Sequence, residues 1–184
     1  MAACHACHRP SRFSWRRPSL AARPTGRTPH LLEVALRLPH FDYADPTVVY
    51  FITMRTRQGP PPFTQATLSQ DVIGAPLELQ ARGRVRLYAY ALMPDHLHAV
   101  LSLGEGTSRL PIVLSHFKSY TTRLAWQRGW VGALWQREWY EHAIRGEREL
   151  YRICEYVLAN PARRGLPESW EGCCRVGTAA ALPI

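Results

Sequence analysis

Residues 84–103 read "RVRLYAYALMPDHLHAVLSL", and this stretch decides the fold. Apolar and aromatic residues alternate with others on both sides of Pro94-Asp95, a pair that favours a tight turn. The pattern predicts two antiparallel strands, 84–93 and 96–103, joined as a hairpin. The rest of the fold is built around this pair.

The second strand of the hairpin carries a His-x-His pair. Successive side chains of a strand point to opposite faces, so His96 and His98 point the same way and could share one metal ion. Histidines with this spacing in a strand are more often hydrogen-bonded than metal-bound, and the spacing alone leaves both interpretations open. Asp95 most simply shapes the turn, and support of a metal-bound histidine is a second interpretation.

The segments on either side of the hairpin complete an α+β pattern. Residue types, apolar periodicity and turn residues predict strands at 47–56 and about 139–144, and helices at 66–83, 109–128 and 147–160. The order is strand, helix, strand, strand, helix, strand, helix. It predicts a ferredoxin-like antiparallel sheet with helices on one face and a C-terminal helix that bears a tyrosine.

The second and third predicted helices each carry an apolar stripe, because apolar residues recur there every three or four positions. The stripes consist of Leu110, Val113, Leu114, Phe117, Tyr120 and Leu124 in the second helix, and of Leu150, Ile153, Val157 and Leu158 in the third. We expect these side chains to face the core. Pro161 should mark the end of the last helix, because proline has no amide hydrogen to donate.

Positive charge is concentrated near the N-terminus. The 184 residues carry a formal net charge of +9, and residues 1–40 hold seven arginines against one acid, Glu33. This charge suits a nucleic-acid partner, but a basic arm without a specific partner accounts for most of it as well. We divide the chain into a disordered basic arm at 1–46, one domain at 47–166 and a tail at 167–184 without readable structure.

The cysteines do not form a disulfide framework. Their number is odd and their spacing irregular, which fits a reducing, cytoplasmic setting; they are Cys4, Cys7, Cys154, Cys173 and Cys174. The "CHACH" segment at 4–8 could be read as a zinc cluster, but four donors within five residues cannot easily reach one tetrahedral ion. No apolar run is long enough for a membrane helix, and we expect no membrane partner.

The last predicted helix offers a phenol and an amide near the histidines. Tyr156 and Asn160 lie four residues apart, so both project from one side of the helix. Two imidazoles with an amide oxygen and waters suit Mg²⁺ or Mn²⁺ better than a thiolate-binding ion. Each residue also has an ordinary interpretation, Tyr156 as a half-buried helix tyrosine and Asn160 as a helix end before Pro161.

Four motifs in order give a family resemblance: "MPDHLHAVL", "HFKSYTTR", "LWQREWYEHAIR" and "YVLANPARRGL". Together they resemble the REP-associated tyrosine transposases, which belong to the single-tyrosine HUH transposase superfamily, over roughly residues 47–166. The resemblance implies that His96 and His98 are paired metal ligands, that Tyr156 is the nucleophile and that Asn160 completes the metal site. The fold of that family agrees with the one read from periodicity.

The same resemblance implies the activity and its setting. The expected enzyme is a metal-dependent single-stranded DNA endonuclease and strand transferase that acts at hairpin-forming palindromic repeats through a 5′-phosphotyrosine, in the cytoplasm of a bacterium and in association with its nucleoid. Tyr140 and Tyr151 are rival nucleophiles. A domesticated hairpin-binding protein without cleavage, and a structural protein with packed histidines, are the alternative functions. Both a monomer and a homodimer remain possible.

DNA binding requires cations and flat surfaces for unstacked bases. The expected DNA-binding residues are Lys118, Arg123, Arg152, Arg163 and Arg164, of which Lys118 is the sole lysine of the chain. Four tryptophans are interleaved with the basic residues at 126, 130, 135 and 139, and we expect at least two of them to belong to the core. A phosphate contact by Lys118 is a hypothesis that its replacement by alanine tests.

Overall fold

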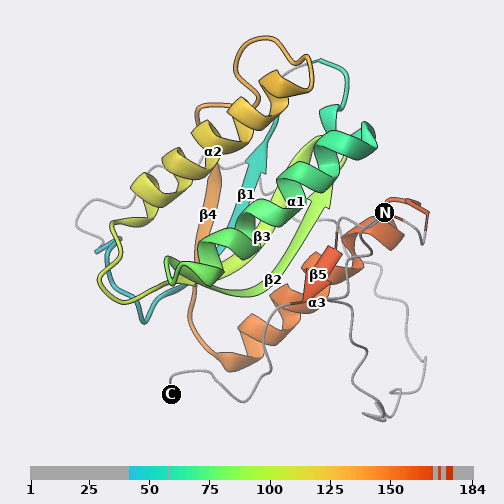
Figure 1. The fold of residues 1–184 in the computed structure, drawn as a ribbon. Helices are drawn as coiled ribbons and strands as arrows, with labels where there is room; N and C mark the ends of the chain where they lie inside the picture. The colour runs from blue at the N-terminus through green and yellow to red at the C-terminus, as the bar shows by residue number, and fades with distance from the viewer. Residues whose placement is uncertain (1–41, 58, 168–169, 171–172, 176–184) are drawn as a thin grey trace, which may run out of the picture. The chain divides into compact units, whose positions relative to one another are not determined.

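The computed structural model describes residues 42–57, 59–167, 170 and 173–175. The predicted disordered arm, apart from its last residues, and the "CHACH" segment lie outside the described residues. The elements are β1 (Val49–Arg55), the 3₁₀ helix η1 (Pro62–Thr64), α1 (Ala66–Ala81), β2 (Val85–Met93), β3 (His96–Leu103), α2 (Leu110–Gln127), β4 (Tyr140–Ile144), α3 (Glu147–Arg163) and β5 (Cys173–Arg175) (Figure 1).

One antiparallel sheet organises these elements, with the strand order β4-β1-β3-β2-β5. The predicted hairpin is β2 and β3, whose register pairs Met93 with His96 across the two-residue turn. The four strands from β4 to β2 have the predicted ferredoxin-like order, and the predicted fold class is confirmed. The tail, for which no structure was readable from the sequence, contributes Cys173–Arg175 as a fifth strand that pairs with β2.

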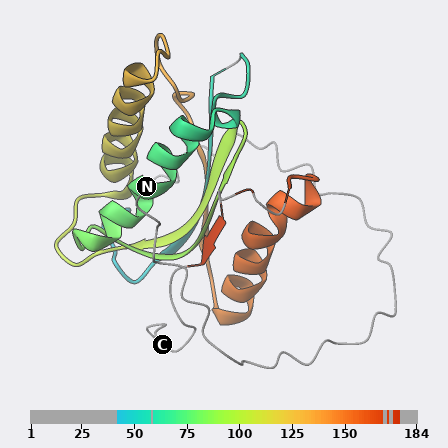
Figure 2. The same ribbon diagram turned by 45° about the vertical axis from the view of Figure 1, so that its right-hand side comes forward.

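The helices divide between the two faces of the sheet. Figure 2 shows α1 and α2 on one side of the strands and α3 on the other. The larger core cluster joins α1 and α2 to the sheet through Leu68, Val72, Leu110, Val113 and Phe117. A smaller cluster on the opposite face joins Leu150, Cys154 and Val157 of α3 to Val49, Phe51, Ala89, Ala91 and Val100. None of the described helices is long and apolar enough to cross a membrane.

The apolar stripe of α2 departs from the prediction in its last turns. After Phe117 the buried positions are Thr121 and Ala125, whereas Tyr120 is 44% exposed. Thr121 is fully buried because its hydroxyl donates to the carbonyl of Phe117 at 2.8 Å and accepts from Nε1 of Trp135 at 2.8 Å. A threonine therefore occupies the core position that apolar counting assigned to tyrosine.

The last helix runs one turn past the predicted end. Pro161 lies inside α3, which ends at Arg163. A proline removes only its own amide from the helical ladder, and the amides beyond it still find acceptors. The amide of Arg164 donates to the carbonyl of Asn160 at 3.0 Å, and that of Leu166 donates to the carbonyl of Pro161 at 3.0 Å. Trp170 then donates its Nε1 hydrogen to the carbonyl of Leu92 at 2.7 Å, which ties the following segment to β2.

Candidate active site

The His-x-His pair of β3 lies on the face of the sheet that α3 covers. His96 and His98 are 4% and 6% exposed, and alternation along β3 places them on the same side as Val100 of the smaller core cluster. Their two Nε2 atoms are 3.1 Å apart. The prediction that the two imidazoles share one face is confirmed, and the structure adds that their outer nitrogens converge.

The inner nitrogen of each imidazole has its own partner. Nδ1 of His96 lies 2.6 Å from Oδ1 of Asp95, and Nδ1 of His98 lies 2.8 Å from Oγ1 of Thr53 on the neighbouring strand. A carboxylate accepts, so Nδ1 of His96 carries the hydrogen and Nε2 keeps its lone pair. The Thr53 hydroxyl can accept from His98 in the same way. Such partners on the far nitrogen are typical of metal-binding histidines.

The geometry of the pair fits a divalent metal. A metal–nitrogen distance of about 2.1 Å in tetrahedral or octahedral coordination separates two adjacent nitrogen ligands by roughly 2.9 to 3.4 Å, and the observed separation of 3.1 Å falls within that interval. Within the part of the chain that the structure describes, no group of three or more His, Cys, Asp or Glu side chains could hold a metal. Among the described side chains near the pair, Asn160 offers an amide oxygen as a candidate further ligand.

Both histidines are held neutral, as metal ligands must be. Burial lowers the pKa of His98 to about 3, and His96, Arg55 and Arg164 act in the same direction. Burial also lowers the pKa of His96, against the hydrogen bond and charge of Asp95, which raise it. Arg55 and Arg164 place positive charge around the pair, which suits an anionic substrate such as a phosphodiester.

The turn before β3 is tied to the rest of the domain. The carbonyl of Asp95 accepts from both the amide and the hydroxyl of Thr56, each at 2.9 Å, and the carbonyl of Pro94 accepts from the amide of Phe63 at 3.1 Å. Burial would raise the pKa of the Asp95 carboxyl, but the hydrogen bond and charge of His96, together with Arg55, hold it below its usual value. Asp95 therefore both shapes the turn and orients His96.

Tyr156 lies beside this pair. Its ring centroid is 5.9 Å from that of His98 and 6.2 Å from that of Phe51, and the guanidinium of Arg163 lies 5.5 Å from the centre of the tyrosine ring. The side chain is 41% exposed, so part of the ring is open to solvent. Among the rivals, Tyr140 packs edge-on against Phe51 at 6.0 Å, and Tyr151 is partly buried on α3.

Asn160 is fixed by the backbone of Tyr156. Its Nδ2 donates to the Tyr156 carbonyl at 3.0 Å, and the residue is only 7% exposed. This bond identifies which end of the amide is the nitrogen, so that Oδ1, the atom a hard cation requires, is the other end. The structure thus places Asn160 on the Tyr156 helix with an oriented amide, and its role as a metal ligand stays a prediction.

The N-terminal turn of α3 is anchored to β4. Glu149 accepts from the amide of Arg145 at 2.8 Å, and its other oxygen is 2.9 Å from Nε2 of His142. These two contacts, in that order, lower the pKa of the Glu149 carboxyl. Together with burial of Leu150 and Val157 against the sheet, they set the position of the helix that carries Tyr156.

The predicted DNA-binding residues do not form one group. Arg152, Arg163 and Arg164 are exposed on or just after α3, on the side of the histidines. Arg123 is exposed on α2, which packs on the opposite face of the sheet. Lys118 donates to the carbonyls of Gln136 and Arg137 at 3.0 Å each and of Glu138 at 3.4 Å, which gives it a structural role that the phosphate hypothesis did not foresee.

The tryptophans agree with the expectation that at least two of the four belong to the core. Trp135 is buried at 4% exposure, and Trp130 and Trp139 are partly buried against the same core cluster. Trp126 is 53% exposed, and its Nε1 donates to the carbonyl of Gly132 at 2.7 Å. Trp126 is therefore the most open of the four to a base.

Sequence reasoning missed the contribution of β1. Thr53 faces His98 in the strand register and Arg55 faces His96, and Phe51 stacks on His98 with ring centroids 5.5 Å apart. A signal was present, because alternation within the predicted strand 47–56 places these three residues on one face. The pairing of that strand with β3 was not readable from local sequence.

The chain is similar in sequence to several bacterial proteins. No protein-family model matches it. An uncharacterized protein of Haemophilus influenzae is 25% identical over 163 residues, which cover 69% of this chain and 87% of that protein. A REP-associated tyrosine transposase of Escherichia coli K12 is 22% identical over 119 residues, which cover 65% of this chain and 68% of the relative.

A solved protein structure is also similar to this chain. It is that of a REP-associated tyrosine transposase bound to a REP hairpin, and it matches with a TM-score of 0.58 at 20% identity, over 71% of this chain and 78% of that one. The match shows that the two proteins share a fold. The resemblance carried by the four motifs is confirmed by these matches: the chain is similar in sequence to REP-associated tyrosine transposases and shares the fold of one of them.

Proposed function

We propose that this protein is a metal-dependent single-stranded DNA endonuclease and strand transferase that acts at hairpin-forming palindromic repeats. The observation that carries the proposal is the convergence of two neutral imidazole nitrogens, 3.1 Å apart, beside the ring of Tyr156. The hairpin substrate is proposed because the solved relative is bound to a REP hairpin. A place of action at the bacterial nucleoid follows from that substrate.

Each residue has a defined task in this proposal. His96 and His98 would hold Mg²⁺ or Mn²⁺ through Nε2, while Asp95 and Thr53 keep the hydrogens on Nδ1. Asn160 supplies Oδ1 as a further ligand. A cation held there would supply Lewis-acid chemistry, which polarises a phosphate oxygen and offsets developing negative charge.

Tyr156 is the nucleophile. A bond forms between its Oη and phosphorus while the bond from phosphorus to the 3′ oxygen breaks, the phenol loses its proton and the leaving oxygen gains one. The product is a 5′-phosphotyrosine and a free 3′-hydroxyl, and the ester keeps enough energy for rejoining without ATP. Arg163, Arg164 and Arg152 lie on the same helix or just beyond it, where they can neutralise the backbone on either side of the break.

The test is the formation of a covalent adduct. Hairpin oligonucleotides from repeats of the host genome are labelled at either end and incubated with protein and Mn²⁺ or with a chelator. The 3′ label should move with the protein in denaturing gels, the 5′ label should appear on a shortened free strand, and chelation should abolish both.

Matched tyrosine variants assign the nucleophile. Tyr156→Phe should form no adduct, whereas Tyr140→Phe and Tyr151→Phe should form it as the wild type does. If the hairpin binds tightly but neither the wild type nor any variant forms an adduct in the presence of metal, the protein is a hairpin-binding protein without cleavage. An adduct that survives in Tyr156→Phe contradicts the assignment of the nucleophile and leaves the reaction intact.

A further inference from the structure

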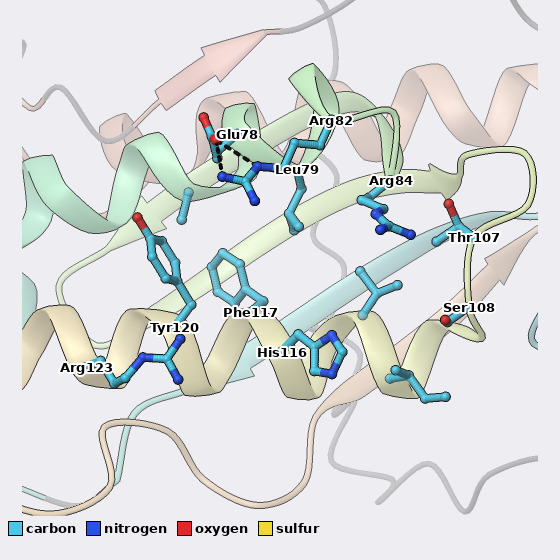
Figure 3. Close-up of a pocket in the computed structure, with 13 residues that line it drawn as sticks. Glu78, Leu79, Arg82, Arg84, Thr107, Ser108, His116, Phe117, Tyr120 and Arg123 are labelled. Carbon is cyan, nitrogen blue, oxygen red and sulfur yellow. Dashed lines mark hydrogen bonds and ion pairs between the residues drawn. The ribbon is translucent and has the colours of Figure 1, made fainter.

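A groove lies between α1 and α2, on the face of the sheet opposite His96 and His98. It encloses about 400 Å³, within the range of roughly 300 to 1,000 Å³ typical of small-ligand pockets. Its walls are helical, and the segment around Thr107 and Ser108 closes one end (Figure 3). Nothing in the proposed cleavage reaction uses this groove.

The rim of the groove is cationic. Arg82 is paired with Glu78 in the same helix at 2.7 Å, so these two charges largely offset one another. Arg84 and Arg123 are exposed at the groove and have no carboxylate partner among the described residues. The hydroxyls of Thr107 and Ser108 lie at the same end as Arg84 and offer hydrogen bonds to an anion (Figure 3).

The floor and one wall of the groove are apolar. Phe117 and Val113 are buried beneath it at 4% and 6% exposure. Tyr120 and Ile112 stand above them on α2 and are 44% and 45% exposed. An exposed aromatic ring in a groove with arginines that have no carboxylate partner among the described residues is an arrangement that suits single-stranded nucleic acid, whose bases stack and whose backbone attracts cations.

We propose that this groove binds a segment of single-stranded DNA, with a base stacked on Tyr120, one phosphate held by Arg123 at the same end and another held by Arg84 toward the opposite end (Figure 3). The choice of DNA as the occupant rests on the proposed function, whereas the anionic and aromatic character of the ligand follows from the groove itself. Because the sheet separates the groove from the histidine pair (Figure 2), the segment bound here is not the one that is cut. It anchors the substrate at a distance from the scissile phosphate.

The electrostatic part is tested by salt dependence. Binding of a fluorescein-labelled oligothymidine is followed by anisotropy at several salt concentrations in the metal-free protein. Single-stranded DNA gives a slope of about −0.7 in log affinity against log salt for each phosphate neutralised. The double variant Arg84→Gln, Arg123→Gln should flatten the slope by about 1.4. The control double variant Arg137→Gln, Arg148→Gln removes two exposed arginines outside the groove. It should change the slope less than the groove double variant does.

The stacking part is tested at Tyr120. Tyr120→Ala should weaken binding roughly five- to hundredfold, as expected for the loss of one stacked base, and Tyr120→Phe should restore it because the ring is kept. A photoreactive iodouridine in the oligonucleotide should cross-link to the peptide that contains Tyr120. Circular dichroism confirms that the variants are folded, and Tyr120 is exposed enough that its truncation leaves the core intact.

The outcomes separate this proposal from the cleavage reaction. If the groove variants bind with wild-type affinity and slope, and the cross-link maps elsewhere, the groove is not a DNA site, whatever the adduct assay gives. If the groove variants lose binding while wild type forms no Tyr156 adduct, the groove proposal stands and the cleavage proposal fails. Equal losses in the groove and control variants would also overturn the proposal, because they would indicate a response to total charge.

Discussion

Lys118 provides a prediction that the structure makes quantitative. Its ammonium group joins α2 to the segment before β4 through the carbonyls of three consecutive residues, and it lies 4.7 Å from the centre of the Trp139 ring. Lys118→Met keeps the length and the apolar stem of the side chain and removes the charge and the three donors. We expect this substitution to lower the free energy of unfolding.

The magnitude follows from the contacts. Two of the hydrogen bonds are well formed at 3.0 Å and the third is weak at 3.4 Å. Because Lys118 is only partly buried and water can replace it at the carbonyls, each good bond should contribute about 1 kcal/mol, below the usual value for a charged donor. The contact with the Trp139 ring adds about 0.5 to 1 kcal/mol. The expected loss in the free energy of unfolding is therefore about 2.5 to 3 kcal/mol.

Urea unfolding followed by circular dichroism measures this loss, and oligothymidine binding is measured in parallel. Lys118→Arg is the matched control, because it keeps the charge but cannot place a single nitrogen against three carbonyls. Lys118→Met should lose stability and keep most of its DNA affinity. A change in unfolding free energy below about 0.5 kcal/mol, together with a large loss of DNA affinity that Lys118→Arg restores, would refute the structural role and support a phosphate contact.

Two further predictions concern stability. Below the ordinary histidine pKa, His98 takes up a proton in the unfolded chain but not in the folded chain, where burial lowers its pKa to about 3. The free energy of unfolding of the metal-free protein should therefore fall by about 1.4 kcal/mol between about pH 7.5 and 5.5 because of this residue. Urea unfolding of wild type and of His98→Asn at the two pH values measures the difference. A Cβ on Gly104 would collide with the backbone carbonyl of Gly83, so Gly104→Ala should lower the free energy of unfolding by about 2 to 4 kcal/mol. Gly74 lies on α1 with open space around it, so Gly74→Ala should raise the free energy of unfolding by about 0.5 to 1 kcal/mol.

The local sequence was sufficient to predict most helices and strands and the shared face of His96 and His98. The Pro94-Asp95 turn sets the register of β2 and β3, and the two-residue period of β3 then determines which side chains share a face. The predicted strand and helix bounds agree with the structure to within a few residues, apart from the last turn of α3. These features depend on residues close together in the chain, which is why they were readable.

Features that depend on pairing between distant segments were not readable. The partners Thr53 and Arg55 of the histidines follow from the register of β1 against β3, across at least forty residues of intervening chain. Counting apolar residues assigned Tyr120 to the core, whereas Thr121 is buried there and accepts a hydrogen bond from Trp135, which lies on a different segment. The same holds for β5, whose three residues form a strand because the edge of β2 is available to them.

The turn at Pro94-Asp95 also limits where this domain can accept inserted residues. Hairpin tips usually accept insertions, tags and length variation, because they are exposed and few contacts depend on them. Here the tip holds His96 through the Asp95 carboxylate, and both of its carbonyls are bonded to other segments. One added residue would move Leu97 toward the place of a histidine and send the imidazoles to the opposite face. Length variation among functional relatives should therefore be found in other loops, and the tip is a poor place to graft a label.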